Sequence, residues 1–259
     1  MKETIISLGG GCDIATILDT YGLRSQSLPF DWLWNLDTGL SDVTKIIASD
    51  FSGLRDRDSY AYTSHYKWQE ADSLVFRDYP RIAHIHTNPL KNDYQRETYN
   101  RRINKFIQLM EDDLAPITFM YYRLHHEGVE AQSNDIIQQR LAHLFEESNQ
   151  FMAMMDAKYP NRNFKLISLF EALEEGVTEG LLHNQFNELV AKQTRSDIYF
   201  EFITPRPETD DQLRKKWSKN WLAILQKYKL ISWQDQLLVR PRKIRKKLRR
   251  HYLKYSQKR

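Results

Sequence analysis

The feature that most constrains the fold is a strand, a glycine turn and a helix at the start of the chain. Residues 4–8 are an apolar run rich in β-branched side chains, which predicts a buried strand. Residues 9–11 are all glycine, and Cys12, the only cysteine of the chain, follows them. Apolar side chains then recur at helical spacing over residues 13–21, so the sequence predicts a helix that begins at or just after the cysteine.

A cysteine at a helix N-terminus is well placed for nucleophilic chemistry. Unpaired backbone N–H groups and the positive end of the helix dipole both lower the pKa of a thiol, and the thiolate is the nucleophile. The amides of Gly10 and Gly11 can serve as an oxyanion hole. Other interpretations stay open: Cys12 is a small core residue, or the turn is a phosphate cradle. The like charge of Asp13 also disfavours a thiolate beside it.

Short apolar strands alternate with helices along the rest of the chain. This alternation predicts an α/β fold of three layers with a mainly parallel central sheet, a small β-hairpin insertion and a basic C-terminal helix. In such folds, ligands sit at the carboxyl ends of the strands. The expected strands are 4–8, 116–122, 164–169 and 198–203, the hairpin is 73–77 with 81–86, and the expected helices are 13–21, 37–51, 94–111, 134–158, 179–193 and 208–229.

The length of 259 residues allows a sizeable core, and we expect one α/β domain over residues 1–238 and a basic tail over 239–259. A single cysteine excludes intramolecular disulfides and fits a reducing compartment. No signal peptide and no membrane span is recognisable, so a cytoplasmic location is expected.

The basic character of the chain is concentrated in its tail. From Arg240 to Arg259 there are eleven Lys or Arg residues and no Asp or Glu, although the net charge of the whole chain is only +4. The tail is either a solvated terminus or an attachment to an anionic membrane surface, worth about 1 kcal/mol per basic residue near the lipid. Nucleic acid is a less favoured partner, because the rest of the chain is acidic.

The second strand of the expected hairpin carries two histidines. Alternation places His84 and His86 on one face, and Ile82, Ala83 and Ile85 near the core. Two histidines at this spacing can ligate a metal, but no third ligand stands nearby in the sequence, so no metal site is predicted. One histidine is then a candidate catalytic base, and the alternative is that both are structural.

The opening run resembles the start of a bacterial family of papain-like cysteine peptidases, long a domain of unknown function. The shared pattern is S-L-G-x-x-C, a helix, L-R and P-F-D-W. A second similarity is the R-R-I-N-K-F run at 101–106, followed by a strand that ends in arginine. The resemblance covers roughly residues 4–230, and the matching positions of the first pattern are Ser7, Leu8, Gly9, Cys12, Leu23, Arg24, Pro29, Phe30, Asp31 and Trp32.

The resemblance implies a cysteine nucleophile and a histidine base. The family shows a His-Asp pair where this chain has His86-Thr87-Asn88, so His86 takes the base position and the acidic neighbour is missing. Asn88 or Asp31 would then orient the imidazole, or no residue does. For the fold, the alternation of strands and helices outweighs the two-lobed architecture that the papain label implies.

The favoured hypothesis is therefore an enzyme of acyl transfer without a cofactor. Cys12 attacks a carbonyl, His86 or His84 takes and returns the proton, and Asp31 orients the histidine. Water as acceptor makes the enzyme a hydrolase such as a peptidase, and an alcohol makes it an acyltransferase. The anionic part of a small-molecule or peptide substrate is assigned to Arg123, Arg101 and Arg102, whose alternative role is surface charge.

Two other classes of function remain open. One is a transferase of surface polysaccharide biosynthesis that holds coenzyme A or a nucleotide sugar at the glycine turn, with the tail at the inner membrane face. The other is a non-catalytic protein docked on a membrane or nucleic acid, in which Cys12 is merely packed.

Overall fold

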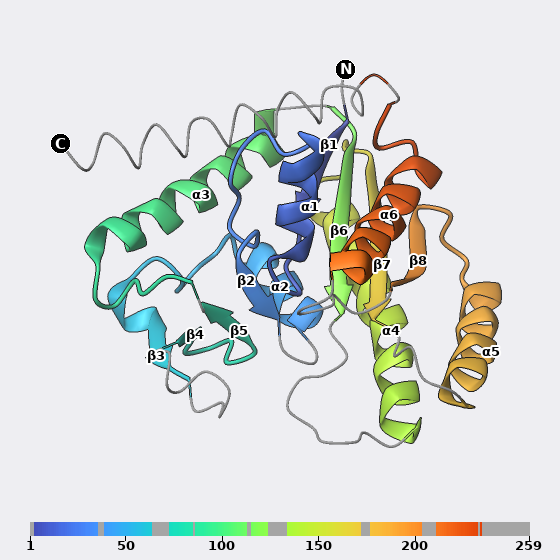
Figure 1. Ribbon diagram of the computed structural model, residues 1–259. Coiled ribbons are helices and arrows are strands. Elements are labelled where there is room, and N and C mark those ends of the chain that lie inside the picture. The colour runs from blue at the N-terminus through green and yellow to red at the C-terminus, as the bar shows by residue number, and fades with distance from the viewer. Residues whose placement is uncertain are drawn as a thin grey trace.

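A four-stranded parallel sheet forms the centre of the molecule in the computed structural model (Figure 1). Its order is β1-β6-β7-β8, and each pair of neighbours is parallel. The strands are β1 (Thr4–Ser7), β6 (Ile117–Arg123), β7 (Phe164–Glu171) and β8 (Ile198–Ile203). The structure describes residues 3–35, 39–63, 73–84, 86–112, 115–123, 134–171, 177–203, 211–232 and 234.

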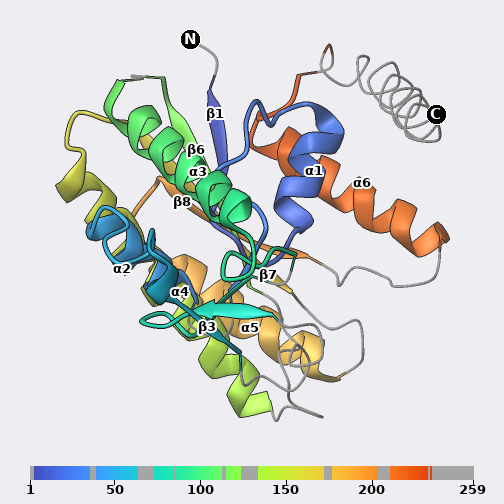
Figure 2. The same cartoon turned by 90° about the vertical axis from the view of Figure 1, so that its left-hand side faces the viewer.

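Helices cover both faces of this sheet, which confirms the predicted three-layer α/β fold (Figure 2). On one face, the apolar sides of α1 and α6 pack with Met120 and Ile167. On the other face, α2, α4 and α5 pack together, and α3 adds its apolar stripe to the same core. The helices are α1 (Asp13–Tyr21), α2 (Gly39–Ala48), α3 (Asp93–Asp112), α4 (Asn134–Lys158), α5 (Val177–Lys192) and α6 (Asp211–Lys227).

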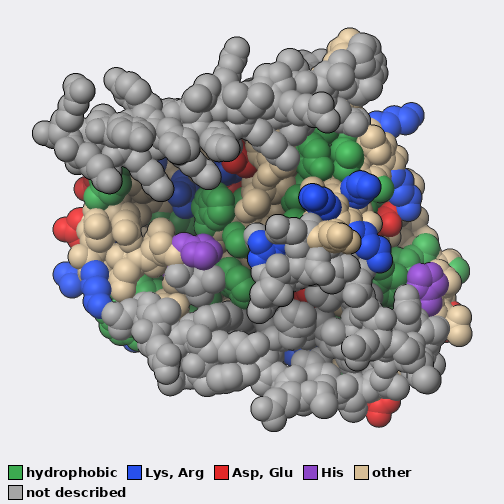
Figure 3. Space-filling view, viewed as in Figure 1, with side chains coloured by type: hydrophobic (Ala, Val, Ile, Leu, Met, Phe, Trp, Pro, Cys, Tyr) green, Lys and Arg blue, Asp and Glu red, His purple; other side chains and the backbone are tan. Residues whose placement is uncertain are grey.

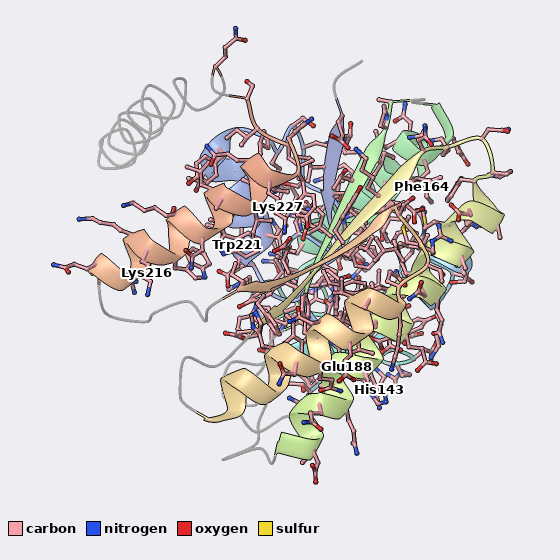
Figure 4. The ribbon with its side chains drawn as sticks, turned by 90° about the vertical axis from the view of Figure 1, so that its right-hand side faces the viewer. His143, Phe164, Glu188, Lys216, Trp221 and Lys227 are labelled. Atoms are coloured by element: carbon pink, nitrogen blue, oxygen red, sulfur yellow. The ribbon has the colours of Figure 1, made fainter. Side chains whose placement is uncertain are left out.

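The amphipathic sequence of α6 explains how it closes one outer layer. Trp217, Trp221 and Leu225, four residues apart, are buried against the sheet. Lys216 lies on the exposed side of the helix, and Figure 4 labels it together with Trp221. In the space-filling view, Lys and Arg side chains gather over α6 (Figure 3).

A second, antiparallel sheet stands where the sequence predicted only a hairpin. The hairpin is confirmed as β4 (Leu74–Phe76) and β5 (Ile82–His84). Two further strands extend it: β2 (Leu33–Asn35) pairs with β5, and β3 (Tyr60–Tyr62) pairs with β4. The order is β2-β5-β4-β3, with a short 3-10 helix η1 (Arg57–Ser59) before β3. The whole sheet is inserted between α1 and β6, with α2 and η1 between β2 and β3, and it leads into α3.

The predicted orientation of β5 is wrong for one of its residues. His84, expected opposite the core side, is 3 % exposed and shares its face with the core residues Leu33 and Leu74. Ala83 points to the other face, where it packs with Val75 in a small separate cluster. Both faces of the small sheet are thus buried at this strand, and alternation alone does not identify the core side.

The predicted basic tail, residues 239–259, lies outside the described residues, as does Ile85. Within the described parts of the chain, no helix is both long enough and apolar enough to cross a membrane.

Candidate functional site

The glycine turn after β1 packs directly on the end of β6. Leu8 extends the parallel ladder by donating its N–H to the carbonyl of Met120 over 2.8 Å. Gly10 has a φ of +93°, and a Cβ at this position would lie 1.6 Å from the carbonyl oxygen of Tyr122. Only glycine allows both this backbone conformation and this close approach, so the turn is held against the carboxyl end of the central sheet.

The opposite side of the turn is held by β2. The Asn35 side chain donates from Nδ2 to the carbonyl of Leu8 over 2.8 Å, and its Oδ1 would lie 2.3 Å from a Cβ at Gly9. Gly11 donates its N–H to the carbonyl of Leu33 over 3.3 Å. The turn is therefore clamped between the two sheets. The predicted oxyanion donor Gly11 already contributes its N–H to this clamp.

Cys12 forms the N-cap of α1, as the sequence predicts. Its carbonyl accepts the first helical hydrogen bond, from the N–H of Thr16 over 2.9 Å, and its side chain is half-buried. The N–H groups of the first helical turn have no acceptor within their own helix, and they give this end of α1 a partial positive charge. Cys12 thus lies at the carboxyl edge of the parallel sheet, at the positive end of a helix.

Beside this turn, the carboxyl ends of β6 and β7 carry buried polar groups. Burial raises the pKa of Tyr122 well above its ordinary value, and the negative charges of Glu171 and Asp13 raise it further. Asp13 and Glu171 are 8 % and 2 % exposed. The α1 side of this edge therefore holds two buried acidic residues, Asp13 and Glu171.

Arg123, a predicted substrate-binding residue, is 1 % exposed and forms an ion pair with Glu147 of α4. Ser41 of α2 donates its hydroxyl to the other carboxylate oxygen of Glu147 over 2.7 Å. These contacts tie β6, α4 and α2 together below the edge of the sheet. They give Arg123 a structural role, and its role toward a substrate remains a prediction.

The two histidines of the candidate site differ in their surroundings. The ring of His84 lies among Tyr60, Phe76 and Tyr99, with centroids 5.5, 4.8 and 5.1 Å away. Burial is the main cause that lowers the pKa of His84 to about 3. This imidazole is therefore neutral near pH 7 and accepts a proton poorly. His86 is exposed.

Asp31, the predicted orienting group, is bound to its own loop. Its Oδ2 accepts hydrogen bonds from Nε of Arg24 and from the N–H of Leu28, both over 2.9 Å. Burial raises the pKa of Asp31, and the charge of Arg24 opposes this effect. Because β5 runs antiparallel to β2, the chain after His84 leads toward the segment of Asp31. Asp31 and the residues that follow His84 therefore lie at the same end of the small sheet.

The paired arginines of α3 are also distinct. Arg101 is exposed, donates from Nη2 to the Thr98 hydroxyl over 2.6 Å, and lies over the ring of Tyr94. Arg102 is half-buried, and its charge acts on Asp31 and His84. Of these two arginines, only Arg102 acts electrostatically on Asp31 and His84, at one end of the small sheet.

A cavity of about 700 Å³ lies at the other end of the central sheet. Its lining includes Thr118, Lys165 and Ile198, which stand at the amino ends of β6, β7 and β8. Lys227, labelled at the end of α6 in Figure 4, lines it as well. Because the strands are parallel, this cavity is remote from Cys12, which follows the carboxyl end of β1. Within the described residues, no group of His, Cys, Asp or Glu is placed to hold a metal ion.

Sequence reasoning missed Asn35 and Glu147. Glu147 had a signal, because it interrupts the apolar stripe of α4 between Leu144 and Phe151 at helical spacing, where a charged residue requires a buried partner. Asn35 gave no comparable signal.

The fold and the site define an α/β protein with a half-buried cysteine at a glycine turn on the carboxyl edge of a parallel sheet. Residues 3–156 match the family described as "Putative papain-like cysteine peptidase (DUF1796)", and the chain belongs to this family. The match includes Cys12, Asp31, both candidate histidines and Arg123, but not β7, β8 or α6. No curated protein and no solved structure matches the chain.

Proposed function

We propose that the protein is a cysteine-nucleophile enzyme that transfers acyl groups, with Cys12 as the nucleophile and water as the acceptor. The observation that carries the proposal is the position of Cys12, half-buried as the N-cap of α1 at the carboxyl edge of the sheet. The family description of a cysteine peptidase supports the same class of chemistry.

In the proposed reaction, the Cys12 thiolate forms a bond to the carbonyl carbon, and the carbonyl electron pair moves onto the oxygen. N–H groups at the start of α1, together with the N–H of Gly10, stabilise this oxyanion, since the N–H of Gly11 is bound to Leu33. Collapse of the intermediate breaks the bond to the leaving group, which takes a proton from an imidazolium. Water, deprotonated by the same imidazole, then cleaves the thioester and releases the acid.

His86 is the stronger candidate for the base. Its ring is exposed, whereas His84 lies in an aromatic cluster with a pKa lowered to about 3. An efficient general base has a pKa near the working pH, and His84 is far from that condition. Asp31, at the same end of the small sheet, remains the proposed orienting group, although it also serves Arg24.

The phosphate-cradle alternative is less well supported. A cradle needs turn backbone that can face a ligand, but Gly9 packs against Asn35 and Gly10 against Tyr122. We therefore keep a donor such as coenzyme A or a nucleotide sugar as the second hypothesis.

The test is the rate of iodoacetamide alkylation against pH. Because Cys12 is the only cysteine, every modified thiol is Cys12, and Cys12→Ser gives the background. We expect an inflection well below the free-thiol value of about 8.5, which His86→Ala shifts upward and His84→Ala leaves in place. An inflection at or above the free-thiol value in all three proteins would remove the nucleophile proposal.

A further inference from the structure

Arg102 is a half-buried cation that lacks a partner within the described residues. No hydrogen bond and no ion pair of its guanidinium is found there, in contrast to its neighbour Arg101. Burial lowers the pKa of Arg102, and the like charges of Arg24 and Arg101 add to this effect, while Asp31 opposes it. A desolvated guanidinium in this setting gains from a further anion.

Two buried polar atoms near Arg102 are also unused. Tyr99 and His84 are each 3 % exposed, and their rings are in contact, with centroids 5.1 Å apart. The Oη of Tyr99 and the Nε2 of His84 have no hydrogen-bond partner within the described residues. The positive charge of Arg102 acts on both residues, in the direction that lowers the pKa of each. Buried polar atoms without a hydrogen-bond partner are costly unless a ligand or water satisfies them.

The carboxylate of Asp31, whose charge acts on Arg102, does not remove the positive charge of that guanidinium. Asp31 is engaged by Arg24, whose guanidinium also lies 5.1 Å from the centre of the Trp32 ring. Arg24 and Asp31 balance each other, so within the part of the chain that the structure describes the charge of Arg102 has no ion-pair partner of its own at this end of the small sheet. A planar guanidinium binds carboxylate and phosphate oxygens with paired hydrogen bonds.

We propose that Arg102, beside the Arg24–Asp31 pair, binds an anionic oxygen group of the substrate, a carboxylate or a phosphate. This inference rests on the proposed function, because it assigns the anion to the molecule that Cys12 attacks. The glycine turn before Cys12 is connected to the segment of Asp31, which lies beside Arg102. The N–H of Gly11 binds the carbonyl of Leu33, and Leu33 stands two residues after Asp31. A substrate that reaches both places would be an acyl compound with an anionic group away from the reacting carbonyl.

Thermal unfolding in the presence of small anions tests the proposal. The full chain is melted with increasing sodium phosphate or sodium acetate, and with sodium chloride to hold the ionic strength constant. We expect one anion to raise the melting temperature of the wild type and of Arg101→Gln, because Arg101 is bound to Thr98 on the same helix. Arg102→Gln should weaken the apparent affinity about tenfold or more, and Arg102→Lys should weaken it less.

The two arms identify the chemistry: a shift with phosphate alone indicates a phosphate, and one with acetate alone a carboxylate. Two outcomes overturn the proposal, namely no shift in the wild type with either anion, or equal shifts in wild type and Arg102→Gln. The Cys12→Ser variant distinguishes a failure of the anion-binding proposal from a failure of the nucleophile proposal. It should retain the anion response whether or not Cys12 is a nucleophile, while the alkylation profile of Arg102→Gln reports on the thiol alone.

Discussion

Arg24 donates from Nε to Oδ2 of Asp31 over 2.9 Å, and the two side chains are 13 % and 3 % exposed. Arg24 follows α1, and Asp31 precedes β2, so this pair fixes the loop that carries the chain from the large sheet to the small one. Phe30, next to Asp31, packs against Phe51 and against Phe106 of α3. The L-R and P-F-D-W motifs thus meet each other, and P-F-D-W also meets the R-R-I-N-K-F run. These contacts give the motifs a shared structural role.

Replacing Asp31 with alanine should lower the free energy of unfolding by about 3 kcal/mol, because it leaves the nearly buried Arg24 without its carboxylate and the Leu28 N–H without its acceptor. Urea denaturation measures this change. The control is Asp93→Ala, which breaks a 2.8 Å ion pair with Arg96 at a side chain that is 74 % exposed. There, the cost should stay below about 1 kcal/mol. Equal costs for the two variants would contradict the structural role of Asp31.

Gly10→Ala should destabilise the protein by several kcal/mol or prevent soluble expression. Its Cβ would lie 1.6 Å from a backbone oxygen of Tyr122, which cannot move without breaking β6. Gly53→Ala is the matched control: its φ is also positive, at +73°, but its Cβ would meet only Asp78 Oδ2 at 3.8 Å. The control isolates the cost of the backbone conformation, about 1 kcal/mol. A Gly10 variant as stable as the control would show that the turn does not rest on β6.

Much of the fold could be predicted because its signals are local. The helix at 13–21 and the strand at 198–203 have the predicted bounds, since apolar periodicity over one segment specifies each of them. Strands β2 and β3 were missed, because the sequence around each of them shows no regular alternation of polar and apolar residues, and each strand exists only through pairing with β5 or β4. The burial of His84 likewise depends on a tertiary contact, because its ring packs against Tyr99 of α3, a helix that begins nine residues later in the sequence.

The candidate site follows the same division. The place of Cys12 at a helix N-terminus was predicted from the residues beside it. The clamp on the glycine turn was not predicted, because it joins residues far apart, such as Asn35 with Leu8, 27 positions away, and Gly10 with Tyr122. Such pairs cannot be predicted from a single sequence unless a charged residue stands in an apolar stripe and requires a buried partner, as Glu147 does in α4.

Glu147→Ala should lower the free energy of unfolding by about 3–5 kcal/mol, because a buried ion pair that loses one member leaves a desolvated charge behind. The variant also removes the acceptor of the Ser41 hydroxyl, so it loosens α2 from α4. Glu146→Ala is the control, since Glu146 is exposed and precedes Glu147 on the same helix. Urea denaturation of both variants measures the difference. Similar values would mean that the pair with Arg123 contributes nothing.

His84→Phe should make the stability of the protein less sensitive to acid. Between pH 7 and pH 5, the unfolded chain protonates His84 at its ordinary pKa of 6.5, whereas burial keeps the folded imidazole neutral with a pKa of about 3. Protons therefore bind the unfolded state, and the free energy of unfolding of the wild type should fall by roughly 2 kcal/mol more than that of the variant. Phenylalanine keeps an aromatic ring among Tyr60, Phe76 and Tyr99. Urea denaturation at the two pH values gives the comparison. If the wild type and His84→Phe lose stability in parallel, the imidazole is protonated in the folded state, and His84 regains its place as a candidate base.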